Sequence, residues 1–297
     1  MFGRLLTAMV TPFDEQGNLD LSCLPMLIDH LLTNGTEGLV VCGTTGESPT
    51  LTHEEKMELF SKTVEYVHGK VPIIAGTGGY DTKSAVNFTR EVDQLGVDGF
   101  LQVTPFYNKP SQEGLYRHFR EIAEATDKPV IIYNIPGRTA VNVQVDTMVR
   151  LAKIPNIVAV KESSGDFAQI SRMISETSDD FMVYSGDDKY ALPIMALGGT
   201  GVVSVAAHVV GKAMGEMVAA FYSGDLHLAQ VLHHQLFPVF EGLFRTTNPV
   251  LVKEALGLIG IPVGSVRLPL VPATLAEKQA IVADLARWIP EIHVELI

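Results

Sequence analysis

Short apolar runs recur along the first two thirds of the chain, and longer amphipathic stretches separate them. The runs are rich in Val, Ile and Leu, and Gly or Pro flanks most of them. This pattern is typical of strands that are buried on both faces, as in a parallel sheet. We therefore predict strands within residues 5–10, 38–43, 71–76, 99–104, 129–135, 156–161, 181–186 and 201–206.

The intervals between these runs carry the period of amphipathic helices. Ser22 and Thr52 are placed to begin helices, and Gly69 and Gly96 are placed to end them. Eight nearly even strand–helix units are the number found in a closed (β/α)8 barrel, so we predict a TIM barrel rather than an open doubly wound sheet. Clear helical stretches between the strands are 52–67, 83–96 and 113–126.

Only helical patterns follow the eighth predicted strand. One of them completes the barrel, and the others form a C-terminal helical extension. We therefore divide the chain into a barrel catalytic domain, residues 1–224, and an extension, residues 225–297. The predicted helices in this part are 207–222, 225–243, 249–259 and 274–290.

Composition narrows the possible partners of the chain. Of its 297 residues, 46% are hydrophobic and 19% are charged, which is typical of a globular protein with a large core. The net charge of −12 and the lack of a basic block argue against a nucleic-acid partner. We find no signal-peptide pattern and no apolar stretch of membrane-spanning length, so we expect no membrane association. Cys23 and Cys42 are expected to be reduced thiols in a cytoplasmic protein.

One lysine stands where barrel enzymes place their chemistry, at the C-terminal ends of the strands. Of twelve lysines, Lys161 alone ends a predicted strand, whereas Lys128 precedes one and belongs at the opposite face. Burial disfavours the charged form of a lysine, and the neutral amine condenses with carbonyl compounds to a Schiff base. The competing interpretation is a buried ion pair with Glu162 or Asp187.

Other strand ends carry groups that suit Schiff-base chemistry on a carboxylate. Tyr133 ends the neighbouring strand and is better placed to carry protons than any histidine, and Thr44 and Tyr107 could extend a relay. The turn at Thr44 and Thr45 resembles an anion cradle, and Arg138 offers a bidentate carboxylate site. Each of these residues taken singly also has an ordinary structural explanation. No cluster has metal-ligand spacing, so we predict no catalytic metal.

Three motifs together resemble one known family. GTTGE at 43–47, YNIPGR at 133–138 and VKESSGD at 160–166, in this order, are similar to the dihydrodipicolinate synthase family. That family belongs to the pyruvate-dependent class I aldolases. The resemblance covers essentially the whole chain. It implies a carbon–oxygen lyase of lysine and diaminopimelate biosynthesis, which condenses pyruvate with L-aspartate 4-semialdehyde.

The resemblance also implies a role for each site residue. Lys161 would form the Schiff base with pyruvate, with no other cofactor. The pyruvate site would comprise Thr45, Gly186 and Val203. Tyr133 would donate and accept the proton, coupled through Thr44 to Tyr107 from a neighbouring subunit, and Arg138 would bind the carboxylate of the aldehyde. The subunit arrangement of the family implies a homotetramer built as a dimer of dimers.

The family's inhibitory L-lysine site is altered in this sequence. Members that L-lysine inhibits have histidine at the position of Lys56, asparagine at that of Tyr80 and glutamate at that of Ser84. The glutamate pairs with the inhibitor's ammonium group. Its loss, together with the new positive charge of Lys56, predicts weak or absent inhibition.

Two other functions remain open from the residues alone. One is another pyruvate-dependent aldolase or lyase, such as N-acetylneuraminate lyase or a keto-deoxy-sugar acid aldolase. Arg138 argues against it, because those relatives lack arginine at that position. The other is a non-catalytic ligand-binding barrel, which an assay with pyruvate would distinguish.

Overall fold

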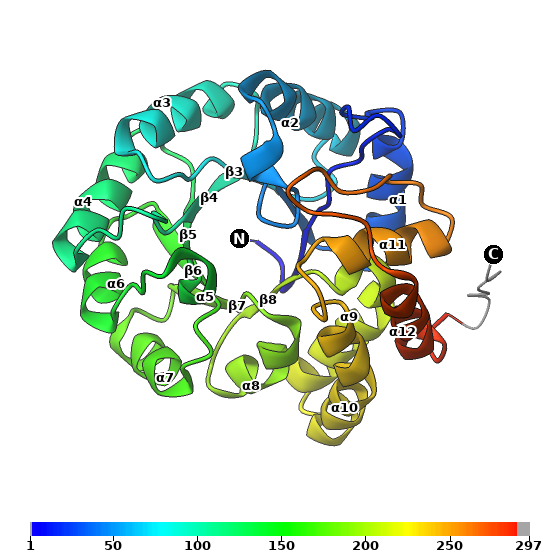
Figure 1. Cartoon of the computed structure of the whole chain (residues 1–297). Helices are drawn as coiled ribbons and strands as arrows, with labels where there is room; N and C mark the ends of the chain where they lie inside the picture. The colour runs from blue at the N-terminus through cyan, green and yellow to red at the C-terminus, as the bar shows by residue number, and fades with distance from the viewer. Residues whose placement is uncertain (1, 290–297) are drawn as a thin grey trace.

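Eight parallel strands close into a barrel in the computed structural model, which describes residues 2–289. Each strand pairs with the next along the chain, and β1 pairs with β8. Figure 1 shows the helices as a ring around them. The predicted strand positions and the TIM barrel are confirmed. The strands are β1 Leu5–Ala8, β2 Gly38–Val41, β3 Ile73–Gly76, β4 Gly99–Val103, β5 Val130–Asn134, β6 Ile157–Glu162, β7 Met182–Ser185 and β8 Gly201–Ser204.

Helices fill the intervals between strands, and their ends follow local side-chain chemistry. Thr52 begins α2 with a capping box that includes Glu55, as predicted. The predicted start at Ser22 is wrong by one residue, because its hydroxyl bonds to Asp20 and Cys23 takes the cap position. The helices are α1 Leu24–Thr33, α2 His53–Val67, α3 Thr82–Asp93, α4 Gln112–Ala123, α5 Pro136–Thr139, α6 Val145–Leu151, α7 Phe167–Glu176, α8 Ala191–Ala196 and α9 Ala207–Ser223, with short 3₁₀ turns η1 Ser48–Thr50 and η2 Asp188–Tyr190.

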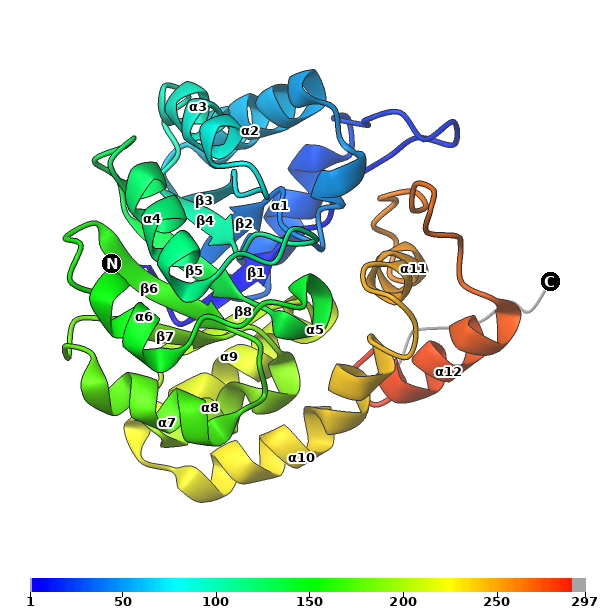
Figure 2. The ribbon, with the colours of Figure 1, turned by 60° about the vertical axis from the view of Figure 1, so that its left-hand side comes forward.

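The C-terminal extension contains α10 Leu226–Gly242, α11 Val250–Leu258 and α12 Leu275–Leu285. Figure 2 shows α10 running along α8 and α9, and α11 at the end of the barrel where α5 lies. The last residue of the predicted helix 274–290 lies outside the described residues, as does the rest of the predicted extension to 297. None of the described helices has the length and apolar character needed to cross a membrane.

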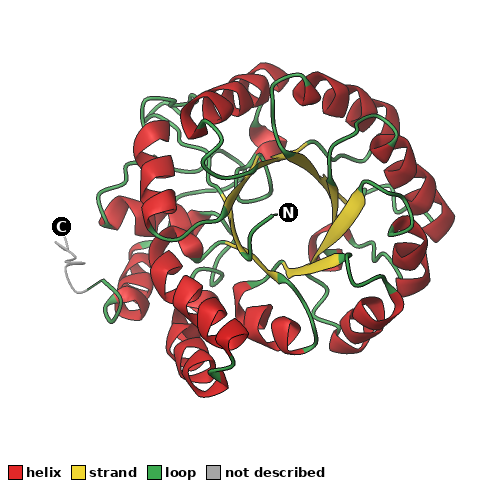
Figure 3. Cartoon of the chain, turned by 180° about the vertical axis from the view of Figure 1, so that it is seen from behind, coloured by secondary structure: helices red, strands yellow, loops and turns green. Residues whose placement is uncertain are grey.

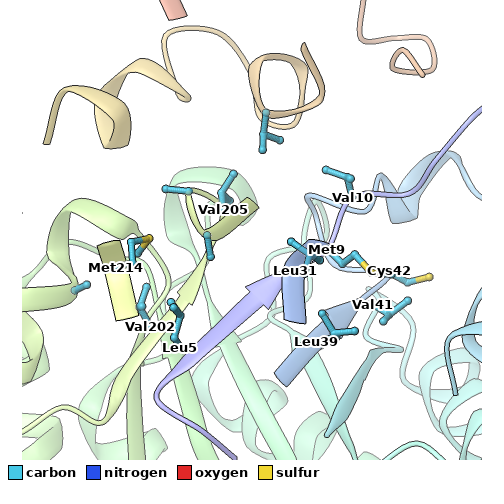
Figure 4. Close-up of a cluster of buried hydrophobic side chains, with 14 of the residues drawn as sticks. Leu5, Met9, Val10, Leu31, Leu39, Val41, Cys42, Val202, Val205 and Met214 are labelled. Atoms are coloured by element: carbon cyan, nitrogen blue, oxygen red, sulfur yellow. The ribbon is translucent and has the colours of Figure 1, made fainter. Parts of the chain in front are cut away.

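The barrel has two separate hydrophobic cores because strand side chains alternate between its faces. The outer core lies between the strands and the helices and includes Leu39, Val41 and Val202. Figure 4 shows the part of this core around β1 and β8. The inner core fills the barrel and includes Leu6 and Val40. Figure 3 shows the ring of strands, with the start of the chain lying across its opening.

A β-bulge decides which face of β6 points into the barrel. Val130 pairs with Ile157, but the next residue of β5, Ile131, pairs with Ala159, so Val158 is an extra residue. Such an insertion reverses the alternation of the residues that follow it. Ala159 therefore joins the inner core, and Lys161, two residues later, points the same way.

Candidate active site

Lys161 lies inside the C-terminal end of the barrel. It pairs with Tyr133 of β5 on one side and with Tyr184 of β7 on the other. Its side chain is only 5% exposed, and its Nζ atom lies 4.3 Å from the centre of the Tyr133 ring. Within residues 2–289 this amine has no ion pair and no hydrogen bond. The predicted alternative of a buried ion pair is therefore wrong for the described chain.

Glu162 cannot neutralise Lys161 because the two side chains point to opposite faces of β6. The carboxylate accepts hydrogen bonds from the Asn134 side chain at 2.9 Å and from the backbone N–H of Ser164 at 2.6 Å. Burial raises the pKa of Glu162 above its usual range. This residue holds the loop after β6 in place outside the barrel.

Asp187, the other proposed partner, lies at the end of β7 and contacts a different lysine. Its nearest cation is the Nζ atom of Lys189 at 3.9 Å. Burial raises the pKa of Asp187, and the charges of Lys189 and, more weakly, Lys161 oppose that shift. Asp187 is thus a half-buried carboxylate that interacts with the charge of Lys161 at a distance and forms no ion pair with it.

The absence of a side chain at Gly186 leaves space for the Lys161 side chain. A Cβ atom at position 186 would lie 2.0 Å from the Ser163 hydroxyl oxygen and 3.0 Å from both Cγ and Cε of Lys161. Any larger residue would push the lysine stem aside. The structure therefore places the predicted Gly186 directly against the proposed nucleophile.

The turn after β2 is compact and strained at both ends. The Glu47 N–H donates to the Thr44 carbonyl at 3.0 Å, and Cys42 and Glu47 both have positive φ. Non-glycine residues in this conformation persist when their surroundings hold them. Thr45 is buried within the turn and Thr44 is half-buried. A turn fixed in this way could present its hydroxyl and N–H groups to an anion.

An ion pair from the C-terminal extension holds this turn. The Glu47 carboxylate lies 2.9 Å from Nζ of Lys253 in α11, and both side chains are buried. The same carboxylate accepts the Arg267 backbone N–H at 2.9 Å. Burial lowers the pKa of Lys253 to about 8. Sequence reasoning missed Lys253, because a lysine in an amphipathic helix gives no signal of a distant buried partner.

The three predicted proton-carrying residues are not joined by hydrogen bonds within the described chain. Tyr133 is buried in the inner core, but no hydrogen bond in the described residues joins its hydroxyl to Thr44 or Tyr107. Tyr107 lies in the loop between β4 and α4, is 92% exposed and has a φ of 72°. At this exposure the Tyr107 ring is not packed inside its own barrel. The chain alone therefore does not complete the predicted relay.

Arg138 and Val203 flank the Lys161 region from two other strand ends. Arg138 lies in α5, the one-turn helix after β5, and its exposed guanidinium makes no ion pair within residues 2–289. It is thus available to an anionic ligand. Val203 of β8 is fully buried in the inner core, so its side chain closes the barrel rather than contacting solvent.

His208, the histidine nearest to a strand end, is not placed for proton transfer. Its Nδ1 donates to the Val205 carbonyl at 2.8 Å, and its Nε2 accepts the Val10 N–H at 3.2 Å. Burial lowers the pKa of His208 to about 4, so the ring is neutral. The preference for Tyr133 over a histidine is consistent with this arrangement. Residues 2–289 contain no group of three or more His, Cys, Asp or Glu side chains that could hold a metal ion.

Comparisons with known proteins assign the family. Residues 1–287 match the model of the dihydrodipicolinate synthetase family. The chain belongs to this family. It is 55% identical to the 4-hydroxy-tetrahydrodipicolinate synthase of Desulforudis audaxviator, over 94% of this chain and 95% of that protein. The membership confirms the resemblance read from the three motifs.

Solved structures of the dihydrodipicolinate synthetase family have the same fold. A dihydrodipicolinate synthase from Bacillus anthracis superposes with a TM-score of 0.94 at 50% identity, covering 96% of this chain and 98% of its own. The enzyme from Cyanidioschyzon merolae, solved with lysine bound, superposes with a TM-score of 0.94 at 45% identity, covering 96% of this chain and 97% of its own. These relatives are synthases, so the comparisons favour that activity over the other pyruvate-dependent aldolases.

Proposed function

We propose that this chain is a 4-hydroxy-tetrahydrodipicolinate synthase, which condenses pyruvate with L-aspartate 4-semialdehyde. The observation that carries the proposal is the environment of Lys161. Its amine is enclosed by the barrel, lies over the Tyr133 ring and makes no ion pair within residues 2–289. Among the described lysines, Lys253 is also buried, but it is bound to Glu47.

The reaction begins when the neutral Lys161 amine attacks the keto carbon of pyruvate. Tyr133 returns a proton to the resulting hydroxyl, which leaves as water and gives the Schiff base. Thr45 and the backbone at Val203 hold the pyruvate carboxylate. Loss of a proton from the pyruvate methyl group gives an enamine, which attacks the aldehyde of the second substrate. That substrate's own amine then displaces Lys161, closing the ring and restoring the enzyme.

Arg138 orients the second substrate in this proposal. Its guanidinium, which makes no ion pair in the described part of the chain, lies in the helix after β5 and matches the planar carboxylate of L-aspartate 4-semialdehyde. Tyr107, at 92% exposure, enters the barrel of a neighbouring subunit and connects Thr44 and Tyr133 to solvent. The active enzyme is thus a homo-oligomer, a tetramer formed as a dimer of dimers, which needs no cofactor beyond the lysine adduct. The two free cysteines support a cytoplasmic location.

Borohydride trapping tests the covalent intermediate. Pyruvate and borohydride should add one reduced pyruvyl group, found by peptide mass spectrometry at Lys161. Lys161→Arg should abolish trapping because a guanidinium stays protonated. Lys128→Arg is the matched control, since Lys128 lies before β5 and pairs with Asp93 at 3.0 Å. Labelling at another residue, or none, would show that the mechanism is wrong.

A second assay separates the synthase from the other aldolases. After pyruvate is bound, L-aspartate 4-semialdehyde should turn over much faster than N-acetylmannosamine or a sugar aldehyde. Preference for a sugar aldehyde would keep the Schiff base but overturn the proposed acceptor.

A further inference from the structure

The Thr45 hydroxyl receives its hydrogen bond from the C-terminal extension and not from the barrel. Asn248 lies between α10 and α11, 203 residues away in sequence, and its Nδ2 donates to Oγ1 of Thr45 at 2.9 Å. Asn248 is 5% exposed and Thr45 is 3% exposed. This bond is therefore shielded from water, and its geometry is fixed by packing.

A threonine hydroxyl has one proton to donate and two lone pairs to accept with. Because the Asn248 amide occupies an acceptor position, the O–H of Thr45 is left to donate elsewhere. From this geometry we infer that Asn248 is a positioning residue, which turns the Thr45 hydroxyl into a fixed donor for the carboxylate of pyruvate. The inference rests on the proposed function, in which Thr45 binds that carboxylate.

The other half of the Asn248 amide supports a role beyond packing. Its Oδ1 atom is buried and has no hydrogen-bond partner in the described structure. An unsatisfied buried amide oxygen costs about 1–3 kcal/mol, so an asparagine kept only for packing would be poorer than an apolar residue of the same size. The residue is thus held for the N–H group that it presents to Thr45.

The support around Asn248 is rigid. Five residues later, Lys253 forms the buried ion pair with Glu47, in the same turn that contains Thr45. The extension therefore contacts this turn at two residues, through a hydrogen bond to Thr45 and an ion pair with Glu47. Because small displacements of a substrate-binding donor have large effects on binding, these two contacts would keep the Thr45 hydroxyl in its binding position.

Asn248→Asp tests the direction of the hydrogen bond. A carboxylate cannot donate, so it would draw the Thr45 proton toward itself and would also repel the carboxylate of pyruvate. We expect the KM for pyruvate to rise about tenfold or more, with a smaller change in kcat. Asn248→Ala should raise KM by a smaller factor, since the hydroxyl is then free to rotate. Thr247→Ala, an exposed neighbour in the same loop, is the matched control and should leave both constants unchanged.

Thr45→Val supplies the background that separates positioning from general structural damage. If Asn248 acts through Thr45, Asn248→Ala should have almost no further effect on the pyruvate KM in Thr45→Val, whereas Asn248→Asp keeps its charge repulsion in that background. Fully additive effects of Asn248→Ala and Thr45→Val would overturn the inference, as would an unchanged KM in folded Asn248→Asp. If Thr45→Val by itself leaves the KM unchanged, the assigned role of Thr45 fails, and the inference with it, while trapping at Lys161 still tests the reaction separately. If Asn248→Asp does not fold, the Asn248→Ala cycle alone decides.

Discussion

Buried carboxylates show how single positions respond to their surroundings. Asp188, the first residue of η2, is fully buried, and one of its oxygens accepts the backbone N–H groups of Val205 and Ala206 at 3.1 and 2.9 Å. Burial nonetheless raises its pKa to about 6. The folded protein therefore holds this proton over a pH range in which the unfolded chain, with a pKa of about 3.9, has released it.

Asp188→Asn should change how stability depends on pH. A raised pKa contributes stability that is present below about pH 4 and is lost as the pH rises through 6. The amide keeps an acceptor for both N–H groups without the charge, so the variant should gain stability relative to wild type between pH 4 and 6. The gain should then level off at up to about 3 kcal/mol.

Thermal midpoints measured from pH 4 to 7 would check this result. His208, whose pKa is about 4, has the opposite dependence, but it is present in both proteins and cancels in the difference. Asp179→Asn, at an exposed position, is the control. A constant difference between Asp188→Asn and wild type would contradict the assignment.

Arg138→Ala should separate the two substrates. The guanidinium has no partner in the described chain, so its removal should leave the fold and the trapping of pyruvate unchanged. The KM for L-aspartate 4-semialdehyde should rise about tenfold or more, because a charge-assisted bidentate contact is lost. Arg138→Lys keeps the charge but loses the bidentate guanidinium, so its KM should lie between those of the wild type and Arg138→Ala. Equal damage to trapping and to aldehyde use would indicate a structural role for Arg138.

The contact between α11 and the turn after β2 joins the extension to the barrel. Lys253→Met would leave the Glu47 carboxylate buried beside an apolar side chain, which typically costs about 3–5 kcal/mol. Glu47→Gln should be milder, because burial has already lowered the pKa of Lys253 to about 8 and the lysine can release its proton. The double variant should recover much of the stability lost in Lys253→Met.

Thermal unfolding of the two single variants and the double variant measures this coupling. Lys278→Met, which removes the more exposed pair of Lys278 with Glu254, is the control and should change the midpoint little. If Lys253→Met is no worse than this control, the buried pair does not hold the turn.

In the proposed assembly, Tyr107 of a neighbouring subunit completes each site, because this side chain is 92% exposed in its own chain. Tyr107→Phe and Lys161→Ala should each reduce activity strongly. Mixed subunits of the two variants should regain about a quarter of the wild-type activity, since one site in a mixed dimer then has both Lys161 and a partner tyrosine. Subunit exchange followed by the steady-state assay measures this value. Activity equal to the sum of the separate variants would show that Tyr107 does not act across subunits.

A surface pocket of about 460 Å³ contains the residues predicted to abolish L-lysine inhibition. It is lined by His53, Lys56, Tyr80 and Ser84, among others, and burial lowers the pKa of Lys56. His53 pairs with Glu91 at 3.0 Å. Ser84 has a hydroxyl where inhibited members of the family have a glutamate, and Lys56 adds a like charge. The carboxylates of Asp81 and Glu91 also line the pocket, but they bind Ser84 and His53 of the same chain. We therefore expect L-lysine to inhibit weakly or not at all.

Titration of L-lysine into the steady-state assay checks this expectation. The triple variant Lys56→His, Tyr80→Asn and Ser84→Glu, measured in parallel, should be inhibited at much lower L-lysine than the wild type. Strong inhibition of the wild type would show that the pocket binds L-lysine through other contacts.

The local pattern of the chain was enough to predict the barrel. Runs of Val and Ile flanked by Gly or Pro, with amphipathic stretches between them, placed all eight strands, because burial on both faces leaves a continuous apolar signature. Lys161 stood out for the same reason, as a lysine that closes such a run. Helix starts do not follow from the apolar pattern alone, because Ser22 and Cys23 compete for one cap position and the neighbouring Asp20 decides between them.

Contacts between distant segments determine the orientation of Lys161 and the partners of Thr45 and Glu47, which the local pattern does not show. The bulge at Val158 turns Lys161 into the barrel, and no local feature of the sequence marks it, because it depends on the pairing with β5. Asn248 is 203 residues from Thr45 in sequence and Lys253 is 206 residues from Glu47, so no local spacing marks either contact. Strand and helix periods arise from neighbouring residues, whereas the orientation of a side chain and its distant partners arise from how the segments pack.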